Sequence, residues 1–94
     1  MKSKNESVLV VDDSPAVLTA ISEMLAASGY AVDTAPDGET GTEMINSKFY
    51  DIILTDLVMP GMDGMEVLKY VSDNSQESIC IMVTGHGTIK SAVE

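Results

Sequence analysis

The sequence predicts an α/β protein in which helices cover both faces of a parallel β-sheet. Short apolar runs alternate with helical patterns along the 94 residues. Runs of this length are typical of buried parallel strands, and the helices between them make the crossover connections. The runs end in acidic or hydroxyl-bearing residues. Because the carboxyl ends of parallel strands share one edge of the sheet, we expect these polar side chains to gather there.

Residues 8–11 are the first predicted strand, and a helix-start signal follows them. Ser14 is a good N-cap, and Pro15 suits the first helical position because that position needs no N–H donor. Apolar residues then recur every three or four positions, which indicates one apolar stripe. We expect Gly29 to cap the end of this helix and residues 30–35 to form a strand near the edge of the sheet.

Asp37 and Gly38 open a second predicted helix, which we expect to end near Lys48. Its apolar face is thin and consists chiefly of Met44 and Ile45. We therefore expect this helix to be the more loosely packed one.

Residues 51–55 form the third predicted strand, and its apolar character favours a central place in the sheet. A loop with Pro60 and Gly61 follows, and Asp63 is the expected cap of a third helix. The apolar stripe of that helix consists of Met65, Val67, Leu68 and Val71.

The last part of the chain continues the alternation. Residues 73–76 are predicted as a polar turn, residues 78–83 as a fourth strand, and Thr88 as the start of a fourth helix that reaches Glu94. Residues 1–6 are polar and are predicted as a frayed leader. The order of elements is βαβαβαβα, which is typical of a sheet with helices on both faces.

Composition excludes several classes of function. The net charge is −10, with five lysines and no arginine, so direct binding to nucleic acid is not expected. No apolar stretch approaches ~20 residues, so we expect no membrane-spanning helix. Cys80 is the one cysteine, which excludes a disulfide framework and predicts a cytoplasmic location. We expect its thiol to act as a small hydrophobe.

Three aspartates at the ends of predicted strands indicate a site for a hard cation. Asp12 and Asp13 follow the first strand, Asp56 follows the third, and Thr84 follows the fourth. Mg²⁺ prefers oxygen ligands and takes one or two protein carboxylates, so Asp13 and Asp56 fit as ligands and Asp12 fits a contact through water. A carboxylate can also attack phosphorus, with the Thr84 hydroxyl as a donor to the phosphoryl oxygens.

Each of these residues also has a purely structural interpretation. Taken alone, Asp13 fits a helix cap, Asp56 fits a loop residue, and Asp63 fits a cap best. The adjacent Asp12 and Asp13 are harder to explain without a cation, because like charges gain nothing from one another. His86 is typical of a solvated loop, and as the one histidine it argues against zinc. The methionines at 59, 62 and 65 are typical of core filling.

Three segments together resemble the response-regulator receiver domains. VLVVDDSP at residues 8–15 resembles their opening strand, and DLVMPGMDG at residues 56–64 resembles their phosphoacceptor loop. VTGHG at residues 83–87 resembles the fourth-strand switch of regulators that act on sigma-54 promoters. The resemblance implies a flavodoxin-like, doubly wound parallel sheet with strand order 2-1-3-4, as one domain over residues 1–94.

The resemblance also implies a role for each site residue. Asp56 would receive a phosphoryl group from a sensor histidine kinase. The Mg²⁺ ligands would be Asp12, Asp13, Asp56 and the carbonyl oxygen of Val58. Thr84 would bind the phosphoryl group and signal through the fourth strand and helix to an output domain or downstream protein. Val58 and His86 stand where receivers tune loss of phosphate. Such a domain is not an enzyme beyond catalysing its own phosphorylation and dephosphorylation.

The family continues with a fifth strand and helix, which carry an aromatic switch residue and a phosphate-binding lysine. Lys90 falls in the predicted fourth helix and is not that lysine. We therefore expect a receiver that is incomplete at its C-terminus and whose phosphorylation is weak or absent. Its fourth strand would be an exposed apolar edge, so we expect a destabilised chain, a dimer through the fourth strand or fourth helix, or completion by another polypeptide.

Two other functions stay open at this point. The chain could be a structural interaction module whose edge strand recruits a partner without phosphotransfer, and Mg²⁺ affinity would separate this function from that of a receiver. It could also be a metal-dependent phosphohydrolase with Asp56 as nucleophile. A phosphohydrolase of that kind needs a second carboxylate two residues on, where Val58 stands.

Overall fold

Strands and helices alternate along the chain in the computed structural model, which describes residues 6–83. In chain order the elements are β1 (Ser7–Val11), α1 (Pro15–Ala27), β2 (Ala31–Ala35), α2 (Gly38–Ser47), β3 (Ile52–Asp56), α3 (Gly64–Asn74) and β4 (Ile79–Val83). Thr84, His86 and the predicted fourth helix lie outside the described residues, as do residues 1–5 of the predicted leader.

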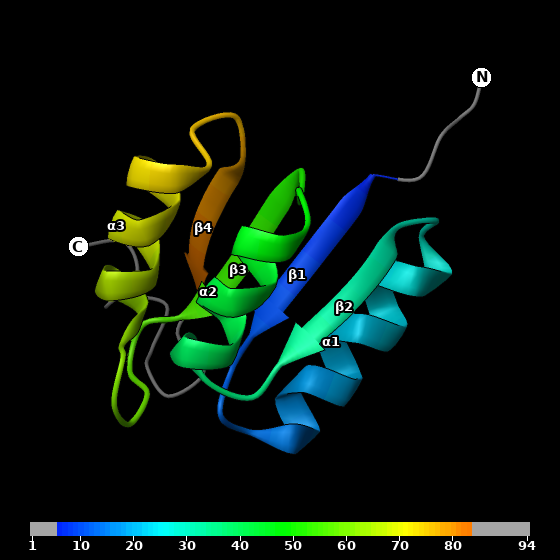
Figure 1. Ribbon diagram of the computed structural model, residues 1–94. Coiled ribbons are helices and arrows are strands. Elements are labelled where there is room, and N and C mark those ends of the chain that lie inside the picture. The colour runs from blue at the N-terminus through cyan, green and yellow to red at the C-terminus, as the bar shows by residue number, and fades with distance from the viewer. Residues whose placement is uncertain (1–5, 84–94) are drawn as a thin grey trace.

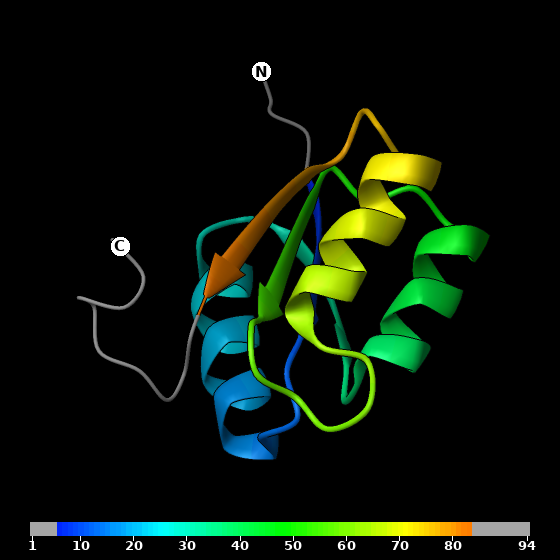
Figure 2. The ribbon, with the colours of Figure 1, turned by 90° about the vertical axis from the view of Figure 1, so that its left-hand side faces the viewer.

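The four strands form one parallel sheet in the order β2-β1-β3-β4 (Figure 1). This order confirms the α/β prediction, with β2 at one edge and β3 between β1 and β4. Helix α1 covers one face of the sheet, and α2 and α3 lie side by side on the other (Figure 2). In the described part of the chain, no helix is long and apolar enough to cross a membrane.

The hydrophobic core lies on the α2 and α3 face of the sheet. Its buried members are Leu9, Val11, Ala35, Ile45, Tyr50, Ile53, Met59, Val67 and Val71. Most come from β1, β2, β3, α2 and α3, Tyr50 and Met59 come from loops, and none comes from α1. Burial of these side chains away from water is the main force that holds the two helices to the sheet.

Helix α2 packs closely, which makes the expectation of a loosely packed helix wrong. Four of its residues are buried, whereas α1 has no buried residue despite its longer apolar stripe. The cause is glycine at Gly38 and Gly41. A Cβ added at Gly41 would lie 3.0 Å from Cγ2 of Val11, so glycine lets the helix come this near to β1 without displacing the valine side chain.

The helix starts are those that the sequence predicts. The Ser14 hydroxyl accepts a hydrogen bond from the Val17 amide at 3.3 Å, and Asp37 Oδ1 accepts one from the Thr40 amide at 2.7 Å. Asp63 forms a reciprocal capping box with Glu66, in which both hydrogen bonds are 3.0 Å long. Each cap satisfies an amide that has no partner inside the helix.

Helix α2 ends at Ser47 with Lys48 as its C-cap, as predicted, whereas the ends of α1 and α3 differ from the prediction by one or two residues. The C-cap of α1 is Ser28, and Gly29 follows it with a φ of 99°, a conformation that favours glycine. Helix α3 continues to Asn74, so the polar residues at 73 and 74 belong to the helix rather than to a turn. Met65 is exposed and lies outside the apolar face of α3, contrary to expectation, whereas Met59 is buried and Met62 half-buried.

Three side chains join β2 to the start of β3, a contact that the sequence did not predict. The Tyr50 hydroxyl donates to Asp33 Oδ2 at 2.6 Å, and Lys48 Nζ lies 3.1 Å from the same oxygen. The hydrogen bond from Tyr50 is the main cause of a lowered pKa of the Asp33 carboxyl, and Lys48 lowers this pKa further. Burial and the neighbouring carboxylate raise the pKa of Tyr50. The cluster places charge beside the β2 edge, where it discourages pairing with another strand.

Candidate metal centre

Three aspartate side chains meet at the carboxyl ends of β1 and β3. Asp12 and Asp13 directly follow β1, and Asp56 is the last residue of β3. One carboxylate oxygen from each lies within 4.8 Å of the other two. Asp12 and Asp56 are buried, Asp56 with 2% of its surface exposed, and Asp13 is exposed. The sequence predicted this convergence, and the parallel register of the two strands produces it.

The chain around Asp12 turns its carboxylate toward the start of α1. The Asp12 amide donates to the Ala35 carbonyl at 3.1 Å, which continues the β1–β2 ladder by one residue. Its Oδ1 accepts a hydrogen bond from the Ser14 amide at 2.8 Å. Because Ser14 is the N-cap of α1, a helix cap does not explain Asp13, whose side chain is left at the exposed rim of the cluster.

Asp56 is held at the end of a central strand rather than in a loop. Its Oδ1 accepts a 3.4 Å hydrogen bond from the Val58 amide, and its carbonyl accepts one from the Thr55 hydroxyl. Gly64 lies directly against the Asp56 backbone, where an added Cβ would collide with the carbonyl. A glycine at the first position of α3 therefore lets the helix begin beside the carboxylate.

The β3–α3 loop (residues 57–63) carries Val58 beside this cluster. Met59 is buried in the core and anchors the loop, while Val58 is exposed. Gly61 has a φ of 73°, and the Gly64 amide donates to the Leu57 carbonyl at 2.9 Å, which closes the loop. The hydrogen bond from its amide places Val58 next to Asp56. Its carbonyl as a metal ligand stays a prediction.

The donor set fits a hard divalent cation. Carboxylate oxygens are the ligands that Mg²⁺ prefers, and oxygens on opposite sides of a bound Mg²⁺ are about 4.2 Å apart, close to the spread of the cluster. Two buried carboxylates so near one another are costly without a positive charge. Among residues 6–83, these three form the one group of acidic, histidine or cysteine side chains that could hold a metal.

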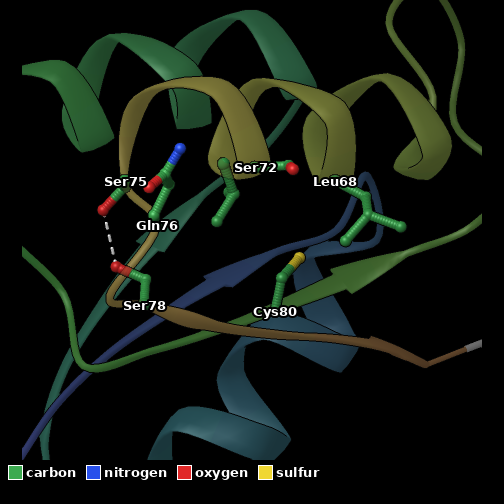
Figure 3. A pocket seen from close by; sticks show the side chains of 7 residues that line it. Leu68, Ser72, Ser75, Gln76, Ser78 and Cys80 are labelled. Carbon is green, nitrogen blue, oxygen red and sulfur yellow. Dashed lines mark hydrogen bonds between the residues drawn. The ribbon is translucent and has the colours of Figure 1, made fainter.

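A groove of about 280 Å³ lies elsewhere, between α3 and β4 (Figure 3). Its lining consists of Leu68, Val71, Ser72, Ser75, Gln76, Ser78 and Cys80. The Ser75 and Ser78 hydroxyls share a 2.6 Å hydrogen bond in its wall, and burial raises the pKa of the Cys80 thiol. The groove lies toward the amino end of β4, whereas the three aspartates lie at the carboxyl ends of the strands.

Known proteins show the same combination of fold and sequence. The family model of the response regulator receiver domain matches residues 8–94. The transcriptional regulatory protein DltR of Streptococcus agalactiae is 40% identical over 77 residues, which are 82% of this chain and 34% of DltR.

Two solved structures are also similar. TrrA of Thermotoga maritima, solved in complex with Mg²⁺-BeF, has 32% identity and a TM-score of 0.83 over 92% of this chain and 75% of its own. The NtrC4 receiver domain of Aquifex aeolicus has 35% identity and a TM-score of 0.78 over 94% and 73%. A dimer of the beryllofluoride-activated NtrC4 receiver domain has also been solved.

The chain is much shorter than DltR, of which it covers 34%. The family model matches the described strands and helices from Val8 onward. With its parallel 2-1-3-4 sheet and the aspartates at its carboxyl edge, the chain belongs to the response regulator receiver domain family.

Proposed function

We propose that the chain is a phosphoacceptor that takes a phosphoryl group from a sensor histidine kinase onto Asp56. The observation that carries this proposal is the meeting of three carboxylates within 4.8 Å, with Asp56 buried at the end of a central strand. The similar structure of TrrA, which was solved in complex with Mg²⁺-BeF, supports a divalent cation as part of the proposed site.

In the proposed reaction a carboxylate oxygen of Asp56 attacks phosphorus. A new O–P bond forms, and the P–N bond to the kinase histidine breaks, so the imidazole is the leaving group. When bound, Mg²⁺ supplies positive charge that offsets the carboxylates and the phosphoryl oxygens. The Val58 amide orients the Asp56 carboxylate through Oδ1.

The other site residues are proposed to bind the cation and the phosphoryl group. Asp12 and Asp13 would hold Mg²⁺ together with Asp56 and the Val58 carbonyl. The Ser14 amide keeps Asp12 turned toward this place. Thr84 follows Val83, which pairs with Asp56 in the sheet, so its hydroxyl is proposed as the donor to the phosphoryl group. His86 is proposed to affect how fast phosphate is lost.

The proposed partners are the kinase and an output domain or downstream protein, reached through Thr84 and the fourth helix. DltR, three times as long as the matched segment, is named a transcriptional regulatory protein, which supports an output in gene regulation. Direct contact between this domain and nucleic acid is not proposed, because its net charge is −10. The free thiol of Cys80 supports a cytoplasmic location.

A second candidate function is an interaction module without phosphotransfer. The observation that favours it is the apolar side of β4, where Ile79, Ile81 and Val83 are 60%, 46% and 39% exposed. The phosphohydrolase alternative gains no such support, because the position that would need a carboxylate holds Val58.

Mg²⁺ binding separates the two candidates. We expect a Mg²⁺ titration to shift the amide NMR signals of Asp13 and Val58, and Asp13→Asn to weaken the affinity at least tenfold, as loss of a ligand should. Asp73→Asn removes an exposed acid on α3 and is the matched control. No shift at either amide would favour the interaction module.

A further inference from the structure

Helix α2 approaches the β3–α3 loop most closely at its first residue. Gly38 is buried, and a Cβ added there would lie 2.6 Å from the carbonyl oxygen of Met62 and 2.9 Å from its Cβ and Cγ. The nearest of these atoms belongs to the backbone, so rotation of a side chain cannot relieve the contact. Any larger residue at position 38 therefore has to move the loop or the helix.

A second contact lies beside the first. Gly61 has a φ of 73°, and the carboxylate of Glu39, the second residue of α2, would lie 3.1 Å from a Cβ added at Gly61. Met62 is half-buried against the core cluster, which limits how the loop can yield. The first turn of α2 therefore bounds the loop at two consecutive positions.

The same helix is also fixed against the strand that carries the other acids. One turn on from Gly38, Gly41 lies against Val11, the last residue of β1. Asp12 and Asp13 directly follow Val11. The Asp37 cap, which accepts from the Thr40 amide, holds the start of the helix in place. Helix α2 thus contacts both the end of β1 and the β3–α3 loop.

From these contacts we propose that Gly38 is a positioning residue for the site. By seating the β3–α3 loop against α2, it sets how far Val58 lies from Asp56, which the strand register already holds beside the acidic pair. The hydrogen bond from Val58 to Asp56 is already 3.4 Å long, so a shift of a few tenths of an ångström would remove it. The proposal rests on the function proposed above and adds a residue that positions the β3–α3 loop.

The test is Gly38→Ala in the full 94-residue chain. We expect the Mg²⁺ affinity, measured by amide shifts, to fall about tenfold, as when an outer partner of a metal ligand is lost. The phosphorylation rate at saturating Mg²⁺ should change less, because every ligand is still present. Ile45→Val is the matched control, since it lowers core burial in the same helix and leaves the contact between Gly38 and Met62 unchanged. Equal affinity in Gly38→Ala and wild type would overturn the proposal.

Met62→Gly tests the same contact from the other side and adds no bulk. Alone it should weaken Mg²⁺ binding, because the loop loses the atoms that rest on α2. Combined with Gly38→Ala it removes two of the three close contacts, so the double variant should bind better than the product of the single effects predicts. Purely multiplicative effects, or unchanged affinity in Met62→Gly, would contradict the role of this contact.

The readouts keep this proposal apart from the proposed function. Mg²⁺ binding without any phosphorylation of the wild type would refute phosphoacceptance and leave the positioning test valid. Normal phosphorylation of the wild type with equal Mg²⁺ affinity in Gly38→Ala would refute positioning alone. A wild type that does not bind Mg²⁺ would overturn both.

Discussion

At the residue scale, the site depends on where each acid stands in the sheet. Asp12, Asp13 and Asp56 could be identified from the sequence because each follows an apolar run, and parallel strands bring such ends together. The hydrogen-bond partner of each carboxylate could not be predicted from the sequence. Asp12 accepts from the Ser14 amide and Asp56 from the Val58 amide, and both contacts depend on local turns.

The contact of Asp33 with Tyr50 and Lys48 could not be predicted, because it joins residues 15 and 17 positions apart on different elements. No local pattern signals such a contact. The contact forms only because the fold brings β2 next to the residues that precede β3. The contact between Gly38 and Met62 could not be predicted from the sequence for the same reason, since it depends on where the fold places α2.

The lowered pKa of Asp33 predicts how stability depends on pH. A carboxyl whose pKa is lower in the folded state stabilises the protein above its unfolded pKa, near 3.8, and this contribution is lost as pH falls through the folded value. We expect urea midpoints to drop between about pH 5 and pH 2, and Tyr50→Phe, which removes the main hydrogen bond, to make the drop shallower. Tyr70→Phe is the control, and an equal slope in both variants would contradict the assignment.

At the element scale, the sequence predicted helix starts better than helix ends or burial. The helix starts could be predicted from their N-cap residues, because a cap is a local contact within three residues. These residues are Ser14, Asp37 and Asp63. Burial depends on neighbours. Helix α1 carries the richer apolar stripe yet has no buried residue, whereas α2 is buried through its glycines.

The capping box at the start of α3 predicts a measurable loss of stability. Asp63→Ala removes the acceptor for the Glu66 amide and should lower the free energy of unfolding by about 1 kcal/mol. Because α3 begins beside Asp56, the first turn should also lose protection from hydrogen exchange. Asp73→Ala, which removes only an exposed ion pair with Lys69, should cost less than about 0.5 kcal/mol. An equal loss of unfolding free energy in the two variants would show that the cap stabilises the protein no more than an exposed ion pair does.

At the scale of the whole molecule, the two faces of the sheet differ in how well they are covered. Helices α2 and α3 bury one face, and on the other, among residues 6–83, α1 is the one helix and packs near β1 and β2 (Figure 2). Within the described residues β4 is an edge strand, and its exposed apolar side chains have no charge among them. Such an edge favours pairing with another strand.

This exposure predicts self-association. We expect light scattering after size exclusion to show a mass above 10.0 kDa that rises with concentration. Ile81→Lys places a charge in the middle of the strand and should return the chain toward monomer. Ser72→Lys adds the same charge on α3 as a control. A monomer at all concentrations, or equal effects of the two lysines, would contradict pairing through β4.

The central claim is that Asp56 accepts a phosphoryl group with the help of the acidic cluster. The most direct test is incubation with acetyl phosphate and Mg²⁺, read by intact mass, with Asp56→Asn as the control. We predict a mass gain of one phosphoryl group that requires Mg²⁺ and is absent in Asp56→Asn. No gain in the wild type while Mg²⁺ still binds, or a gain that persists in Asp56→Asn, would contradict it.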